Sequence, residues 1–200
     1  LFDTSPYPYP REIPDRLKAE RDIRGHFRNI VVAATGTGKT VISAFDYRRF
    51  RSENAGKPCR LLFVAHRKEI LEQSIKCFRG VLHDPNFGEL FVGEHRPDSL
   101  DNLFVSVQTL NSRALTEAVS EDFYDFIIVD EFHHAAAPTY QQLLNYFKPH
   151  ILLGLTATPE RMDGENILRW FDNRIAAEIR LPEAIDRKLL CPVQYFGISD

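Results

Sequence analysis

The sequence predicts an α/β domain of three layers, in which a mostly parallel central sheet lies between two layers of helices. From Asn29 onward, short apolar runs alternate with longer amphipathic segments, and this strand–helix–strand repetition is typical of parallel sheets. Each run is rich in β-branched or aromatic residues and apolar at successive positions, as expected of strands that are buried on both faces. We therefore expect strands at residues 30–33, 61–64, 103–107, 126–129 and 151–155.

Helices are expected in the segments between these runs, at residues 39–51, 67–82 and 138–147. The second of these segments is amphipathic, because its apolar residues recur at helical spacing. A lead-in helix is expected at about residues 15–24. Prolines are frequent from Pro6 to Pro14, so we expect extended backbone or turns there, with Pro14 breaking an early helical turn.

Composition and charge exclude several classes of protein. The chain has 200 residues, of which 44% are hydrophobic, and its 25 Lys+Arg against 28 Asp+Glu give a formal net charge of −3. A disordered chain would have fewer apolar residues and a larger net charge. The acidic balance also argues against a simple basic nucleic-acid binder, although a local basic strip could still contact phosphates.

Cysteine usage and hydropathy indicate the cellular compartment. The three cysteines, Cys59, Cys77 and Cys191, are widely spaced and lack a metal-type spacing, which argues against a disulfide scaffold or a zinc module. No apolar run approaches the ~18 residues that a membrane span needs. We therefore expect a cytoplasmic protein without a membrane partner.

The segment from Ala33 to Thr40 carries the most specific motif of the chain. Its sequence, AATGTGKT, follows an expected strand and opens an expected helix, which is the context of a phosphate-binding loop. The glycines allow backbone N–H groups to point at a phosphate, where the helix N-terminus adds a positive dipole end. Lys39 supplies a charge for the β- and γ-phosphates of ATP, and the Thr40 hydroxyl is a ligand for Mg²⁺. The expected ATP-binding residues are Thr35, Gly36, Thr37, Gly38, Lys39 and Thr40.

A second motif, Asp130-Glu131-Phe132-His133-His134, follows the apolar run at residues 126–129. Carboxylates at the carboxyl end of a buried strand lie where ligands bind in open α/β sheets. We expect Asp130 to hold Mg²⁺ and Glu131 to accept the proton of, or orient, the attacking water. Adjacent histidines rarely share one ion, so we expect His133 to couple to polar groups near the nucleotide and not to hold a metal.

With these two motifs, the chain resembles the first RecA-like domain of superfamily 2 DExH-box helicases and translocases, which are P-loop NTPases. The AxxGxGKT form of that superfamily accounts for Ala33 in place of the usual first glycine. Further segments resemble its motifs Ia, Ib and III in order and spacing, at residues 64–73, 106–110 and 155–161. The Thr-Ala-Thr-Pro-Glu-Arg sequence and the paired histidines are most similar to the bacterial group related to restriction-enzyme Res subunits.

The resemblance implies an ATP-hydrolysing helicase or translocase that moves on nucleic acid, with DNA favoured over RNA. Motifs Ia and Ib of this superfamily contact nucleic-acid phosphates, and such contacts carry little base specificity. The hydroxyls of motif III link the hydrolysis site to the nucleic-acid site. The residues implied at the nucleic acid or in this coupling are His66, Arg67, Gln108, Thr109, Thr156 and Thr158.

The resemblance also implies a division of the chain. Residues 1–26 would be a Pro-rich segment with the lead-in helix, residues 27–190 the ATP-binding domain, and residues 191–200 the start of the connection to a second RecA-like domain. Such motors close two domains around ATP, and the second supplies arginine fingers worth roughly 10³–10⁵ in rate. We therefore expect this chain alone to bind Mg·ATP but to hydrolyse it very slowly.

Two other functions compete with the motor interpretation. A P-loop kinase or small GTPase is not expected to carry Thr-Ala-Thr-Pro after the acidic strand, and no base-reading Asn-Lys-x-Asp sequence occurs. A non-catalytic nucleic-acid or partner-binding domain with the motor fold stays open, because the adenine-reading glutamine of the family is absent near Pro10 and Arg11. The intact Lys39, Asp130 and Glu131 argue against that alternative.

Overall fold

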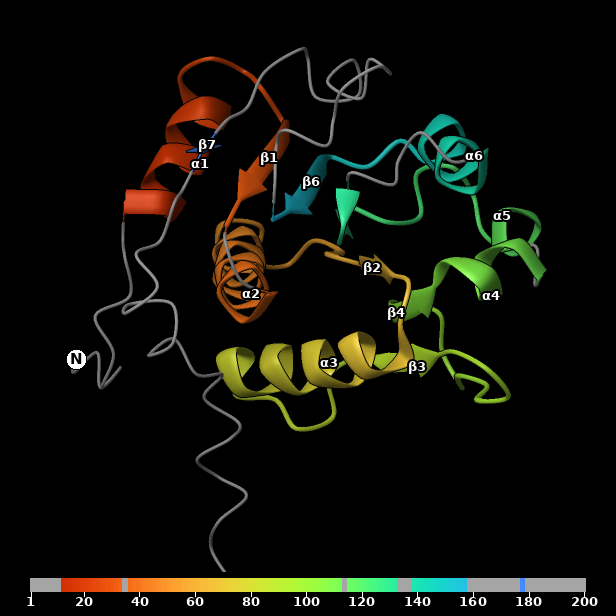
Figure 1. The fold of residues 1–200 in the computed structure, drawn as a ribbon. Helices are drawn as coiled ribbons and strands as arrows, with labels where there is room; N and C mark the ends of the chain where they lie inside the picture. The colour runs from red at the N-terminus through yellow and green to blue at the C-terminus, as the bar shows by residue number, and fades with distance from the viewer. Residues whose placement is uncertain (1–11, 34–35, 113–114, 133–137, 158–176, 179–200) are drawn as a thin grey trace, which may run out of the picture.

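The computed structural model describes residues 12–33, 36–112, 115–132, 138–157 and 177–178. Their central sheet has seven strands in the order β3-β4-β2-β5-β6-β1-β7, and every neighbouring pair is parallel (Figure 1). The predicted α/β class with a parallel sheet is therefore confirmed. The strands are β1 (Arg28–Val32), β2 (Leu61–Ala65), β3 (Glu89–Phe91), β4 (Asn102–Ser106), β5 (Phe126–Val129), β6 (Ile151–Thr156) and β7 (Ala177–Glu178).

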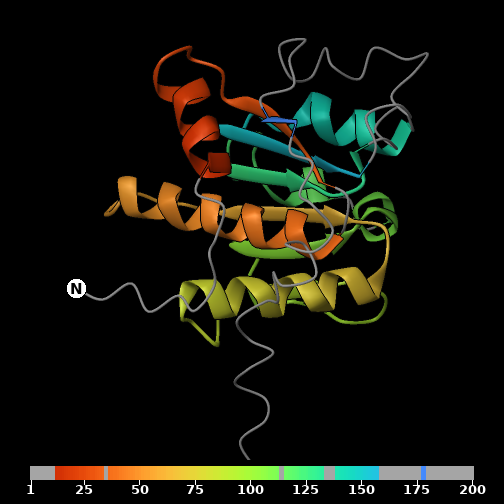
Figure 2. The same cartoon turned by 60° about the vertical axis from the view of Figure 1, so that its left-hand side comes forward.

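Helices cover both faces of this sheet, as the views in Figures 1 and 2 show. Successive strand residues point to opposite faces, so Phe63 packs in one core cluster while its neighbour Leu62 packs in the other. The first cluster contains residues of α1, α2 and α3, and the second contains residues of α4, α5 and α6. The helices are α1 (Glu12–Asp22), α2 (Gly36–Glu53), α3 (Lys68–Leu82), α4 (Val107–Ser112), α5 (Leu115–Ala118) and α6 (Pro138–Tyr146).

The parallel register brings the carboxyl ends of the strands to one edge of the sheet. Val32 at the end of β1 pairs with Thr156 at the end of β6, and Val129 at the end of β5 pairs with Val64 of β2. Motifs that are far apart in the sequence therefore meet at this edge, which is where open α/β sheets bind their ligands.

The starts of α1 and α2 differ from the sequence-based expectations. Pro14 lies within the first turn of α1, which begins at Glu12, so the expectation that Pro14 breaks this helix is wrong. The N–H groups of a first turn have no intrahelical partner, so a proline there loses no hydrogen bond. Helix α2 begins at Gly36 and not at residue 39, which places both glycines of the phosphate loop in its first turn.

Besides the two-residue strand β7, three short elements were not expected from the sequence. Strand β3 has 3 residues, α4 has 6 and α5 has 4, and segments this short carry no periodic pattern. Helix α4 also takes Val107, which the sequence analysis assigned to a strand. These elements extend the sheet beyond β4 and cover the face opposite α3.

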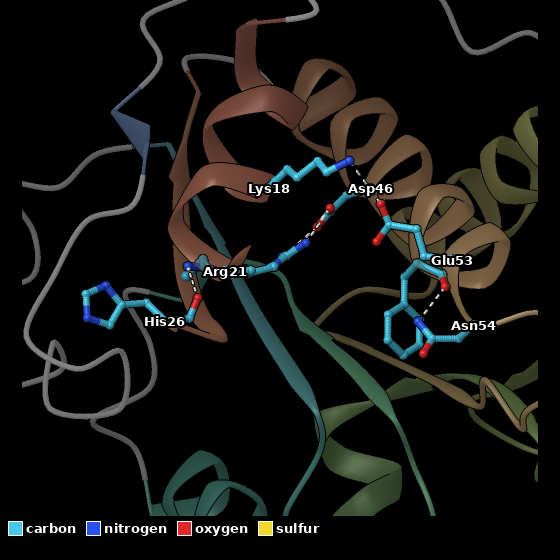
Figure 3. Close-up of polar contacts among 8 residues, drawn as sticks. Lys18, Arg21, His26, Asp46, Glu53 and Asn54 are labelled. Carbon is cyan, nitrogen blue, oxygen red and sulfur yellow. Dashed lines mark hydrogen bonds and ion pairs between the residues drawn. The ribbon is translucent and has the colours of Figure 1, made fainter. Parts of the chain in front are cut away.

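Helix α1 is joined to the domain by a buried polar cluster, drawn in Figure 3. The Arg21 guanidinium donates two hydrogen bonds to the Asp46 carboxylate of α2, at 2.6 and 2.8 Å. Its Nε donates to Asn29 Oδ1 in β1 at 3.0 Å, and Asn29 Nδ2 donates to the carbonyl of His26. One arginine therefore links the lead-in helix, the helix of the phosphate loop and the strand between them.

Among the described residues, no helix combines the length and the apolar character needed to cross a membrane.

Candidate active site

The phosphate loop lies between the end of β1 and the first turn of α2. Ala33 donates its backbone N–H to the carbonyl of Thr156 at 3.0 Å, which fixes the loop to the end of β6. Gly38 and Lys39 lie in the first turn of α2, where backbone N–H groups have no i−4 carbonyl to bind and suit an anion, and Thr40 follows them. Thr35 lies outside the described residues, and of Gly36 and Thr37 only the backbone is described.

Lys39 lies between the two carboxylates of the acidic motif. Its Nζ is 3.0 Å from Glu131 Oε1 and 3.3 Å from Asp130 Oδ1, and the lysine is only 1% exposed. A buried ammonium is stable only when opposite charges compensate it, and here two do so. The structure thus brings together three of the residues that the sequence analysis placed at the hydrolysis site, from positions 39, 130 and 131.

Asp130 is buried at the end of β5 and held in place through its backbone. Its N–H donates to the Val64 carbonyl at 2.9 Å, and its Oδ1 accepts the Glu131 N–H at 2.9 Å. Burial raises the pKa of Asp130 above its ordinary value, and the charge of Glu131 raises it further, while Lys39 opposes both. Burial disfavours the charged form of this carboxylate, and a neighbouring cation offsets that cost.

Glu131 has a backbone conformation that side-chain-bearing residues rarely adopt. Its φ is +53°, in the left-handed region, where a residue other than glycine is strained by about 1–3 kcal/mol. The strand must turn sharply there, and the Glu131 side chain meets Lys39. Strain of this kind persists where a site holds a side chain in a required direction.

The donor set at this edge fits a magnesium–nucleotide complex. A carboxylate and a hydroxyl are hard oxygen ligands of the kind Mg²⁺ takes, and Asp130 and Thr40 supply them. Lys39 and the first-turn N–H groups of α2 supply positive charge for phosphate oxygens. Thr156, fully buried at the end of β6, has a hydroxyl oxygen without a hydrogen-bond partner among the described residues.

The residues implied at nucleic acid follow the neighbouring strands β2 and β4. Arg67 is exposed at the N-cap of α3 in an extended conformation, with φ −108° and ψ 138°, and His66 is half-buried before it. Gln108 is exposed on α4, but Thr109 is buried. The Thr109 N–H donates to Ser106 Oγ at 3.2 Å, and Ser106 Oγ donates to Thr109 Oγ1 at 2.8 Å.

Thr109 therefore stabilises the start of α4, and its burial at 6% exposure leaves its expected contact with nucleic acid without an exposed side chain. Gln108 is left as the exposed candidate of that segment. His133 and Thr158, which the sequence analysis assigned to the hydrolysis site and to coupling, lie outside the described residues.

The sequence analysis missed Tyr140, which lies on α6 and is 1% exposed. Its ring packs edge-on against His66, with the ring centroids 5.4 Å apart. Burial raises the pKa of its hydroxyl, and the charges of Asp130 and Glu131 raise it further. The sequence signalled only an amphipathic helix here, and nothing in that pattern separates a tyrosine at a site from one in the core.

Comparisons with known proteins agree with this geometry. The family described as the res subunit of type III restriction enzymes matches residues 3–161. A 51.5 kDa protein of a Lactococcus phage is 27% identical over 84% of this chain and 32% of its own length. IRC3 of Saccharomyces cerevisiae, named as a candidate ATP-dependent helicase, is 29% identical over 84% of this chain and 26% of its own length. An Escherichia coli type I restriction enzyme EcoAI endonuclease subunit is 27% identical over 88% of this chain and 22% of its own length.

Two solved structures have the same fold. The Pyrococcus furiosus Hef helicase domain matches 89% of this chain and 38% of its own with a TM-score of 0.65 at 21% identity. A nuclease-deletion mutant of the type ISP restriction-modification enzyme LlaGI, in complex with a DNA substrate mimic, matches 92% of this chain and 18% of its own. The TM-score is 0.63 at 20% identity. The RecA-like fold is therefore confirmed, and the chain spans about a third or less of the curated relatives named above.

Proposed function

Because this chain belongs to the res-subunit family of type III restriction enzymes, within the superfamily 2 helicases, we propose that it is the ATP-binding motor domain of a nucleic-acid helicase or translocase. One observation carries this proposal: the buried Lys39 at the head of α2 contacts both Asp130 and Glu131. A strand end that only faces solvent would not bury a lysine between two carboxylates. A domain without catalytic activity would have no need for this arrangement either.

The residues of the site divide the work of ATP hydrolysis. Lys39 exchanges its carboxylate partners for the β- and γ-phosphates, and Asp130 and Thr40 hold Mg²⁺. Bound Mg²⁺ neutralises phosphate charge and orients the phosphates. Once Lys39 has left it, Glu131 is free to accept a proton from the attacking water at its carboxylate oxygen. The Thr156 hydroxyl lies beside the phosphate loop, where it can respond to the nucleotide.

The carboxyl edge of β2 and β4 is the proposed nucleic-acid surface. Arg67 and Gln108 are both exposed there and can reach phosphate oxygens. We favour DNA over RNA as the substrate, and the names of two similar proteins support this choice. One is a subunit of a restriction endonuclease, and the other is a restriction-modification enzyme whose structure contains a DNA substrate mimic.

The motor activity would belong to a longer polypeptide. The curated relatives named above are about three to five times as long as the region they match, as expected if a second RecA-like domain follows a boundary near residues 190–191. That domain would supply the arginine fingers, and we place the whole protein in the cytoplasm. The isolated chain would bind Mg·ATP and turn it over slowly.

The experiment that tests this function is ATP turnover by the full-length polypeptide with and without single-stranded DNA. We expect strong stimulation by DNA, and a loss of about 10²–10⁴-fold in turnover for Glu131→Gln with ATP binding retained. The exposed Glu69→Gln on α3 is the matched control and should turn over like the parent. Turnover retained in Glu131→Gln would remove Glu131 from the mechanism.

A further inference from the structure

Helix α6 connects the two parts of the carboxyl edge. Thr139 accepts a hydrogen bond from Asn111 Nδ2 of α4 at 2.8 Å, so α6 is tied to the helix that carries Gln108. The next residue, Tyr140, packs its ring against His66 at the end of β2. In Figure 1, α6 lies on the same side of the sheet as α4 and α5. One helix therefore contacts the elements after β2 and after β4, both of which lead to the proposed nucleic-acid surface.

The Tyr140 hydroxyl is expected to lower the stability of the fold at its position. The residue is 1% exposed, and its oxygen has no hydrogen-bond partner among the described residues. A buried hydroxyl without a partner destabilises a fold, so a phenylalanine would serve packing as well or better. Tyr146, on the same helix, differs in this respect, because its hydroxyl donates to the Val119 carbonyl at 2.6 Å.

The surroundings of the hydroxyl point to the acidic motif. The Asp130 N–H donates to the Val64 carbonyl, two residues before His66, so the acidic motif and the ring contact of Tyr140 lie at the ends of the neighbouring strands β5 and β2. Burial and the charges of Asp130 and Glu131 raise the pKa of Tyr140. Both carboxylates of that motif face Lys39, and a neutral O–H at the neighbouring strand end is a donor that could take the place of Lys39.

We propose that Tyr140 is a positioning residue: its hydroxyl donates to the acidic motif when Lys39 turns to the nucleotide, and its ring transmits that change to His66. This inference rests on the proposed function, since it assigns the coupling of the same hydrolysis site to nucleic acid. The hydrogen bond would orient the Glu131 carboxylate, and the movement of the ring against His66 would shift the residue that precedes Arg67. Occupancy of either site would then affect the other through α6.

The test compares Tyr140→Phe and Tyr146→Phe in the full-length polypeptide. For Tyr140→Phe we expect DNA-stimulated kcat to fall about 10-fold or more, with KM for ATP within about twofold and a Tm equal to or above that of the parent. Tyr146→Phe leaves the Val119 carbonyl without its partner, so it should lower Tm and leave the DNA stimulation unchanged.

The outcomes separate this inference from the function on which it rests. If the parent is not stimulated by DNA, the proposed function fails and the inference fails with it. If the parent is stimulated and Tyr140→Phe is stimulated equally, only the role of Tyr140 is overturned. A lower Tm in Tyr140→Phe, with activity lost in proportion to folded protein, would also overturn it, because the hydroxyl would then serve the fold.

Discussion

Arg21 of α1 and Asp46 of α2 form a bidentate ion pair that is almost wholly buried, with contacts of 2.6 and 2.8 Å. Since α2 begins in the phosphate loop, this pair ties the lead-in helix to the helix that carries this loop (Figure 3). A buried ion pair of this kind contributes little more to stability than an apolar pair of equal size would. Removing one partner, however, leaves the other as an uncompensated buried charge.

We therefore expect Asp46→Leu to lower the free energy of unfolding by about 3–5 kcal/mol, because Arg21 would stay buried without its partner. The double variant Arg21→Met/Asp46→Leu should recover most of that loss. It should not recover all of it, since Asn29 Oδ1 then loses the hydrogen bond from Arg21 Nε. Urea denaturation of the three proteins measures both effects.

The exposed pair of Lys18 and Glu53 joins the same two helices and is the matched control. Its atoms are 3.5 Å apart and both side chains are about half exposed. Solvent screens such a pair, so Lys18→Met should change the free energy of unfolding by less than about 1 kcal/mol. An equal loss for Lys18→Met and Asp46→Leu would show that burial does not set the strength of the α1–α2 link.

Replacement of Lys39 should make stability depend more strongly on pH than in the parent. Burial already raises the pKa of Asp130, and Lys39→Met removes the charge that opposes this rise. A carboxyl group whose pKa is higher in the folded than in the unfolded state binds more protons when folded, so stability falls as pH rises from about 4 toward the folded pKa. The variant should lose about 3 kcal/mol relative to the parent at pH 8, and less at pH 5.

Denaturation of the parent and Lys39→Met at both pH values checks this expectation. Adding Asp130→Asn to Lys39→Met should flatten the pH dependence, because the titrating group is gone. A loss of stability that is equal at pH 5 and pH 8 would contradict the assignment to Asp130.

Arg67→Ala should weaken the binding of single-stranded DNA by the full-length polypeptide and reduce the salt dependence of that binding. Loss of one phosphate contact lowers the slope of log affinity against log salt by about 0.7. Lys76→Ala removes the same charge from an exposed position farther along α3 and is the control. If both variants change the slope alike, the effect reports net charge and not a contact at Arg67.

Gly88→Ala should destabilise the sheet where β3 meets β4. The φ of Gly88 is +75°, and an added Cβ would lie 2.8 Å from Cε2 of Phe104. Strain and overcrowding together should cost about 2–5 kcal/mol. Gly93 also has a positive φ, of +60°, but an added Cβ meets no atom of the described residues within 4 Å. Gly93→Ala should therefore cost only about 1–2 kcal/mol in the same denaturation experiment.

The long strands and the main site could be predicted because their signals are local. Runs such as residues 61–64 and 126–129 are apolar at every position, and only strands buried on two faces need that pattern. Once the sheet is parallel, residues that follow different strands must share an edge. The meeting of Lys39 with Glu131 across 92 residues follows from that geometry.

The remaining features depend on contacts that no local pattern encodes. Arg21 and Asp46 are 25 residues apart, and each reads in the sequence as an ordinary charged position on a helix. Thr109 looked exposed because it follows a strand end, but the short helix α4 turns its side chain inward to Ser106. Tyr140 fits the apolar face of α6, and only its position beside His66 distinguishes it.

Calorimetric titration of this chain with Mg²⁺ and a non-hydrolysable ATP analogue, beside Lys39→Ala, tests whether Lys39 and its carboxylate partners form an ATP site. We expect the parent to bind the analogue, and we expect no binding by Lys39→Ala once circular dichroism has confirmed that this variant is folded. Equal binding by the two proteins would contradict the assignment of Lys39 and its carboxylate partners to the nucleotide. A folded parent that binds nothing would contradict the claim that this domain carries an ATP site of its own.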